Sequence, residues 1–145
     1  MDKQESNRSH PIARKILTVV VVLLVLAAAR LLLGSKEMMY LSATDVDHIE
    51  ATVLPDNISV TAVGDDSAAA VKILNRTVCH YPQAEKEAGQ SVTLTLYMHD
   101  GTTMTVTACG SHFEIDGKGY KARSSDGEAL VEWAKALSEK TEAQS

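Results

Sequence analysis

The 145-residue sequence lacks the local signatures of the common catalytic sites. It has no Gly-x-Ser-x-Gly elbow, no His-Glu-x-x-His pair and no Gly-x-x-x-x-Gly-Lys loop, which disfavours the serine hydrolases, zinc proteases and phosphate-binding enzymes that use them. We therefore predict a protein that is not an enzyme, with no catalytic residues, no cofactor and no metal site. Aromatic residues are also scarce, with one Trp, one Phe and four Tyr, so aliphatic side chains must fill the core.

Positive charge is scarce after residue 33. Residues 34–145 carry nine Lys and Arg against 17 Asp and Glu, a net charge of −8. Because the nucleic-acid backbone is itself negative, an acidic domain has the wrong sign to bind it. We therefore predict no nucleic-acid partner. Residues 1–15 differ, with four basic and two acidic side chains and a net charge of +2.

The longest apolar run, Ile16–Leu33, has a length suited to a membrane span. About 20 residues cross a hydrocarbon core of ~30 Å, and only Thr18 and Arg30 interrupt this run. We predict a transmembrane signal anchor over residues 16–34, which makes the membrane itself a partner. Since Lys and Arg are enriched on the cytoplasmic side of such spans, the basic segment 1–15 is predicted to be cytoplasmic. The acidic domain of this single-pass protein is then extracytoplasmic.

Two other interpretations of the apolar run stay open. The basic start, the apolar centre and the small residues ending at Ala29 also fit a cleaved signal peptide. Cleavage there would leave Arg-Leu-Leu-Leu as an exposed apolar N-terminus, which favours the uncleaved anchor. The third interpretation is a helix buried in a soluble protein.

Alternating residues after the apolar run indicate an antiparallel sheet. Residues 91–98 place Val, Leu, Leu and Met on one face, and Thr102–Cys109 returns with the same alternation. Between them, Asp100-Gly101 favours a tight type I′ hairpin turn. Two helices are predicted from apolar residues at helical spacing, Ser67–Val78 and Gly127–Ser138. The first has Ser67 as its N-cap, and the second follows the Ser-x-x-Glu capping box that begins at Ser125.

These elements predict an α+β fold in the order β-β-α-β-β-β-β-α. About six strands form one antiparallel sheet, and two helices pack on one of its faces. The domain is predicted to span residues 45–138. A juxtamembrane linker at 35–44 precedes it, and a polar tail at 139–145 follows.

The two cysteines, Cys79 and Cys109, allow three interpretations. Outside the cytoplasm they could form a disulfide, or they could be two separate thiols. The third is a zinc site, because His80 and His112 lie next to these cysteines in the sequence and His99 is nearby. The spacing of these ligands matches no standard zinc motif.

One face of the predicted sheet is rich in threonine, which has two interpretations. Threonine is favoured on exposed strands for its β-propensity alone. Aligned hydroxyls beside a tyrosine would also make an adaptable polar surface for binding. The residues of this candidate binding face are Thr93, Thr95, Tyr97, Thr103, Thr105 and Thr107.

The short helix around Ala69–Asn75 and the hairpin sequences LTLYMHDGTTMTV and FEIDGKGYKA follow a single N-terminal anchor. In this arrangement the chain resembles small membrane-anchored extracytoplasmic domains of unknown function from Gram-positive bacteria. The resemblance implies an extracytoplasmic accessory domain, and it assigns no functional residue.

Three functions are consistent with the sequence. The first is a membrane-anchored extracytoplasmic binding or regulatory module without catalytic activity, whose partner is a protein of the cell envelope. The second is a cell-envelope enzyme with an unrecognised active site. The third is a redox- or metal-responsive sensor that uses the two cysteines.

Overall fold

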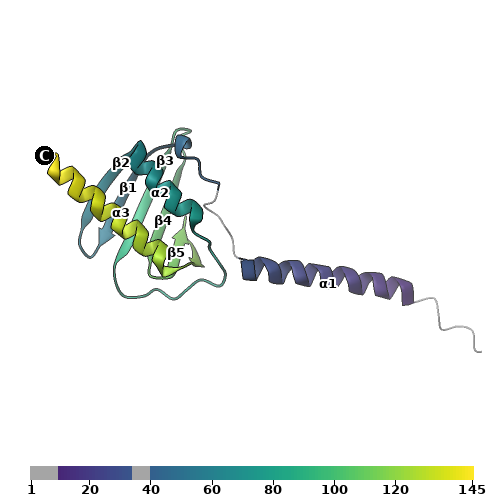
Figure 1. The fold of residues 1–145 in the computed structure, drawn as a ribbon. Helices are drawn as coiled ribbons and strands as arrows, with labels where there is room; N and C mark the ends of the chain where they lie inside the picture. The colour runs from purple at the N-terminus through teal and green to yellow at the C-terminus, as the bar shows by residue number, and fades with distance from the viewer. Residues whose placement is uncertain (1–9, 34–39) are drawn as a thin grey trace, which may run out of the picture. The chain divides into compact units, whose positions relative to one another are not determined.

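The computed structural model describes residues 10–33 and 40–145, which belong to two units, 1–33 and 34–145 (Figure 1). Most of the predicted cytoplasmic segment 1–15 and the first half of the predicted linker 35–44 therefore lie outside the described residues. The end of that linker belongs to the folded domain, because Leu41 packs against the core. Its carbonyl oxygen also accepts a hydrogen bond from Asn75 Nδ2 at 2.8 Å.

Helix α1 (His10–Leu33) contains the apolar run and begins six residues before Ile16. At 24 residues it is about 36 Å long, which exceeds the ~30 Å of a hydrocarbon core. Its stretch Pro11–Arg30 is long and apolar enough to cross a membrane, and none of this stretch is buried within the protein. The hydroxyl of Thr18 forms a hydrogen bond within the same helix, because its Oγ1 donates to the carbonyl oxygen of Arg14 at 2.8 Å.

The second unit is an α+β domain with one six-stranded antiparallel sheet, as predicted from the alternation in the sequence. The strands lie in the order β2-β1-β3-β4-β5-β6, so β1 pairs with both β2 and β3 although α2 separates β2 from β3 in sequence. The strands are β1 (Val46–Leu54), β2 (Ile58–Val63), β3 (Ser91–Met98), β4 (Thr103–Cys109), β5 (His112–Ile115) and β6 (Lys118–Lys121).

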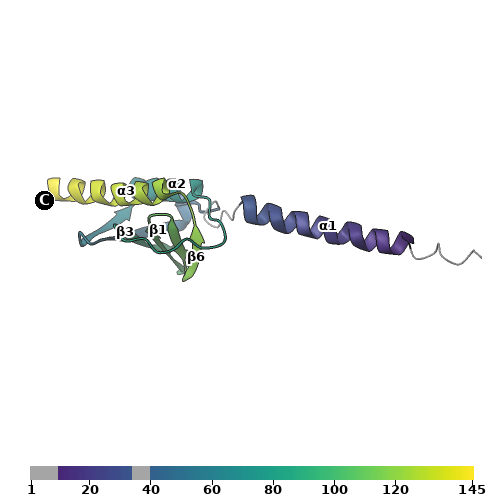
Figure 2. The same cartoon turned by 90° about the horizontal axis from the view of Figure 1, so that it is seen from below.

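Helices α2 (Asp65–Arg76) and α3 (Ser124–Ala143) lie on the same side of the sheet (Figure 2). The face beneath them is aliphatic, as the scarcity of aromatic residues predicted, with Phe113 as the largest fully buried side chain. Burial of these apolar side chains is the main driving force for the fold. Fully buried members of this core include Ile49, Val53, Leu74, Val92, Leu94, Leu96, Val106, Phe113 and Leu130.

The helix starts differ from the prediction. Helix α2 begins at Asp65, after Gly64, whose φ of 56° favours glycine. Ser67 is therefore inside the helix, and its hydroxyl donates back to the carbonyl oxygen of Gly64 at 2.8 Å. Helix α3 begins at Ser124, and its N-cap Arg123 makes no side-chain capping bond. The predicted capping box at Ser125 is wrong because that residue already lies in the first turn.

The end of α3 also differs, because the helix continues to Ala143 rather than ending at Ser138. Most of the predicted polar tail 139–145 is therefore helical. The polar composition that suggested a tail is that of a helix surface in solvent, and Lys140 Nζ reaches Asp66 of α2 at 3.1 Å.

The two Asp-Gly turns adopt different conformations. Asp116 and Gly117 have φ angles of 49° and 83°, the pattern of a type I′ turn. At the other turn only Gly101 has a positive φ, of 85°, so the type I′ prediction there is wrong. The loop between β3 and β4 spans residues 99–102 rather than two residues, and it is held by Asp100 Oδ1, which accepts hydrogen bonds from Thr102 N at 2.9 Å and Thr102 Oγ1 at 2.6 Å.

Candidate binding face

The face of the sheet opposite the helices carries all six residues of the predicted threonine-rich surface, which we call the threonine face. Strand register brings them together in three cross-strand pairs. Because side chains alternate along a strand, pairing places both members of each pair on one face. Thr103 is exposed, and the other five are half-buried by their neighbours. The pairs are Thr93 with Thr107, Thr95 with Thr105, and Tyr97 with Thr103.

A row of hydroxyl groups continues from the threonine face across two further strands. Thr52 of β1 pairs with Thr93 on one side and with Ser59 of β2 on the other. Thr93 Oγ1 and Thr107 Oγ1 are 3.2 Å apart, and Thr52 Oγ1 and Ser59 Oγ are 3.5 Å apart. Each hydroxyl can donate one hydrogen bond and accept others, so the row can adapt to either kind of partner group. Thr52 and Ser59 were not predicted as part of this surface, because the pairing of β1 with β3 is not evident from the sequence.

A cluster of ionisable side chains borders the threonine face at Tyr97. The rings of His48 and Tyr97 stack, with centroids 4.3 Å apart and planes at 10°. Tyr97 Oη donates to Glu50 Oε2 at 3.1 Å. This bond to a carboxylate raises the pKa of Tyr97 above its usual 10.0, because ionisation would break it and place two negative charges together. Tyr97 is therefore a neutral donor held in place from two sides.

A β-bulge completes this cluster. The register of β1 against β3 shifts between Val46 and His48, which leaves Asp47 as the extra residue. Its carboxylate accepts a hydrogen bond from His48 Nδ1 at 2.6 Å and lies 3.5 Å from His99 Nδ1. The bond from His48 is the main cause of a pKa for Asp47 below its usual 3.8. The carboxylate of Asp47 thus contacts His48, near the start of β1, and His99, directly after β3.

The segment between α2 and β3 covers the other end of the same face. His112 of β5 is 3% exposed, and its Nδ1 donates to the carbonyl oxygen of Ala84 at 2.7 Å. The Cys109 thiol donates to the carbonyl oxygen of Glu87 at 3.0 Å, and Ser111 Oγ donates to the Glu87 carboxylate at 3.1 Å. The accessible part of the face is therefore the part that contains the threonine rows.

A disulfide between Cys79 and Cys109, one of the three interpretations of these cysteines, is not formed. Strand pairing places Cys109 opposite His112, His112 opposite Lys121, and Lys121 opposite His80. Three strand spacings, about 14 Å along the sheet, separate Cys109 from the neighbour of Cys79, whereas a disulfide needs Cα atoms within about 7 Å. The zinc alternative meets a similar difficulty, because Cys109 and His112 lie three and two strand spacings along the sheet from His80. In the described ranges, no three His, Cys, Asp or Glu side chains gather around one point.

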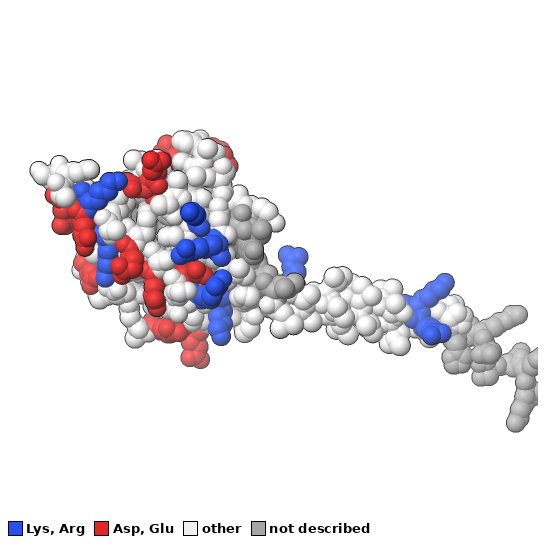
Figure 3. Space-filling model, viewed as in Figure 1, with Lys and Arg blue, Asp and Glu red and all other residues white. Residues whose placement is uncertain are grey.

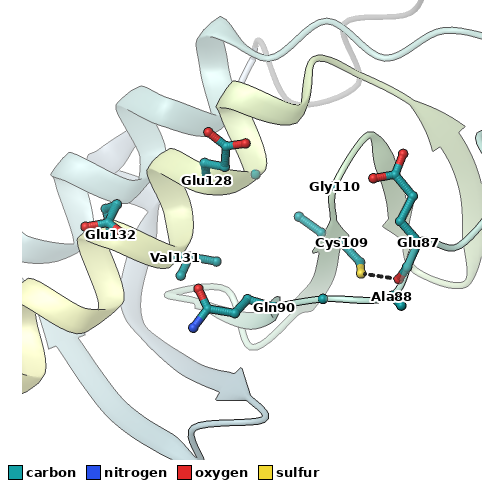
Figure 4. Close-up of a pocket in the computed structure, with 11 residues that line it drawn as sticks. Glu87, Ala88, Gln90, Cys109, Gly110, Glu128, Val131 and Glu132 are labelled. Carbon is teal, nitrogen blue, oxygen red and sulfur yellow. Dashed lines mark hydrogen bonds between the residues drawn. The ribbon is translucent and has the colours of Figure 1, made fainter.

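A cavity of about 250 Å³ lies between α3 and the loop at 87–90 (Figure 4). Glu128 and Glu132 line it from α3, and Glu87 lines it from the loop, beside Cys109. The side chains described as lining it include no Lys, Arg or His. Because carboxylates repel anions, this lining disfavours phosphate or carboxylate ligands.

Charges of both signs interleave on the face shown in Figure 3, with Lys and Arg beside Asp and Glu. Ion pairs join the helices to their surroundings, such as Lys135 Nζ with Asp56 at 3.2 Å and Arg76 Nε with Asp126 at 3.7 Å. The pair of Lys135 with Asp56 lies near the surface and contributes little to stability, whereas Asp126 in the second pair is buried. The face has no continuous basic surface of the kind that binds a phosphate backbone.

Comparison of the chain with protein-family models, with curated proteins and with solved structures finds no match. The assignment of a function therefore depends on the residues described above.

Proposed function

We propose that the protein is a single-pass membrane-anchored binding module without catalytic activity, whose extracytoplasmic domain binds a protein of the cell envelope. The threonine face makes the contact, and the segment Ile16–Leu33 within α1 holds the domain at the membrane. The observation that carries the proposal is the sidedness of the sheet. Helices α2 and α3 cover one face (Figure 2), and the other face presents rows of hydroxyl groups that neither of these two helices covers.

The chemistry of the threonine face supports a protein partner. Its hydroxyl groups can both donate and accept hydrogen bonds, and they are fixed on strands rather than on flexible loops. Tyr97 is held by His48 and Glu50, so little side-chain entropy is lost when it binds. Tyrosine held in this way is a common anchor at protein interfaces. These properties suit a polar protein surface better than a buried small molecule.

The charge distribution around α1 supports the orientation. Arg14 and Lys15 precede the apolar stretch, and residues 34–145 have a net charge of −8. Basic flanks stay on the cytoplasmic side of a span, which places the domain outside. A single cysteine introduced at Ser145 and labelled with a membrane-impermeant maleimide, in intact cells and in lysed cells, tests this orientation. Labelling only after lysis would contradict it.

The partner is tested by crosslinking in the native membrane. A photo-reactive amino acid in place of Thr103, the exposed member of the face, should produce a discrete crosslinked species. Adding Thr95→Lys should remove this species, because it places a longer, charged side chain in the contact. Ala69→Lys is the matched control, since it adds the same charge at an exposed position of α2 on the helix side. Equal loss with both lysines, or a species that Thr95→Lys leaves intact, would contradict the proposal.

A further inference from the structure

Strand β2 forms an open edge of the sheet, whereas the opposite edge is closed. At β6, Lys121 exchanges two backbone hydrogen bonds with His80, of 2.8 and 2.9 Å, and Tyr120 O accepts one from Ala84 N at 3.4 Å. Strand β2 pairs with β1 on one side, and no described strand lies on its other side. Its outward backbone N–H and C=O groups are therefore available to a further strand.

The sequence of β2 lacks the features that usually protect an edge. Natural edge strands carry Lys or Pro, or contain a β-bulge, and these features prevent pairing with another chain. The six residues Ile58–Val63 are Ile-Ser-Val-Thr-Ala-Val, with no charge and no proline. Their register against β1 is uninterrupted from Ile58 to Val63. Val63 is 60% exposed, so the edge also leaves an apolar side chain in solvent.

We propose that β2 pairs with β2 of a second copy of this chain, antiparallel, and joins the two sheets into one continuous sheet. Side chains alternate between the faces of a strand, so only registers in step keep helix-side residues on the helix side. Two registers centred on β2 meet this condition. One places Thr61 opposite Thr61 and Val63 opposite Ser59, and the other places Val60 opposite Val60.

The distribution of charge favours a second copy as the occupant. Two domains that each have a net charge of −8 repel one another over most approaches. Strand β2 itself carries no charge, and two of the acidic residues that flank it have lysine partners from α3. Asp56 lies 3.2 Å from Lys135, and Asp66 lies 3.1 Å from Lys140. These lysines reduce the repulsion between two copies that approach along this edge.

Cysteine crosslinking of the full chain in its membrane tests the pairing. We expect Thr61→Cys or Val60→Cys, in a Cys109→Ser background that leaves only the buried Cys79, to form a covalent dimer when an oxidant is added. Thr52→Cys is the matched control, because it is exposed on the same face one strand inward. Two such residues would be at least about 14 Å apart in the dimer, because three strand spacings separate them, and they should not crosslink. Absence of a dimer with both β2 cysteines, or an equal yield with Thr52→Cys, would overturn the proposal.

A second measurement uses the mass of the full chain in detergent micelles. The parent chain should be dimeric, and Thr61→Lys should weaken the dimer by about tenfold or more, because it brings like charges together across the paired edges. Thr52→Lys should leave the dimer intact. A monomer at every protein concentration would overturn the proposal, and so would a crosslink from β2 to a different polypeptide in place of the dimer. Neither result bears on the threonine face, whose contact is read from Thr103.

Discussion

Replacement of Phe113 by alanine tests whether α3 closes the core over β4 and β5. Phe113 is fully buried, and its strand pairing places it beside Ala108 and Tyr120. Gly127 of α3 lies close above its ring, since a Cβ at that glycine would be 3.6 Å from Phe113 Cε2. Removal of a fully buried ring costs about 3–5 kcal/mol, through lost transfer energy and the remaining cavity. That is a large part of the ~5–15 kcal/mol that stabilises a typical domain.

The assay is urea or thermal unfolding of the full chain in detergent, followed by fluorescence of Trp133. It is the only tryptophan in the sequence, and its Nε1 donates to the carbonyl oxygen of Asp66 at 3.0 Å. The signal therefore reports the contact between α3 and α2 and is insensitive to α1. At about 4 °C per kcal/mol for a domain of this size, Phe113→Ala should lower the Tm by about 12–20 °C.

Leu54→Ala is the matched control, because Leu54 lies on a strand but is 48% exposed. Its loss should cost less than about 1 kcal/mol. If Phe113→Ala were no more destabilising than Leu54→Ala, the helix would not close the core at this point, and the burial described here would be wrong.

Three further predictions concern the ionisable groups and the thiols. Glu50→Gln should lower the raised pKa of Tyr97 toward 10.0, and phenolate absorbance compared with that of Tyr97→Phe measures this change. The raised pKa also stabilises the folded protein below pH 10.0, and this stabilisation is lost as pH rises through the pKa of Tyr97 in the folded protein. The lowered pKa of Asp47 stabilises the folded protein above pH 3.8, and this stabilisation is lost as pH falls through that pKa. Asp47→Asn should remove this pH dependence, and unfolding curves that do not differ between parent and variant at acid pH would contradict the prediction. Cys109, which is half-buried, should react with an alkylating reagent before the buried Cys79, and mass spectrometry of the native protein should detect no bond between them.

The strands were predictable from the sequence because their alternation is local information. The alternation in β3 and β4 correctly predicted that all six residues of the threonine face lie on the same side of the sheet. The pairing of β3 with β1 was not predictable, since it bypasses β2 and α2. That long-range pairing places Thr52 and Ser59 in the same row as Thr93, and it brings His48 onto Tyr97.

The errors at helix starts and turns have a related cause. A serine followed by a glutamate resembles a capping box, but the helix begins where the chain leaves the sheet. For α3 this point is Ser124, one residue before the predicted cap. At Asp100-Gly101 the hydrogen bonds that Thr102 donates to the Asp100 carboxylate favour a longer loop over the two-residue turn.

The position of α3 after all six strands has a consequence for biosynthesis. The sheet is complete at Lys121, but the helix that covers much of its apolar face, Ser124–Ala143, is made after every strand. Until those residues emerge, Leu94, Val106 and Phe113 face solvent with no partner from α3. A chain interrupted at residue 123 would keep every strand and still expose the apolar face of the sheet to proteases and to other chains. Protection of this apolar face therefore depends on residues that are made only after every strand of the sheet is complete.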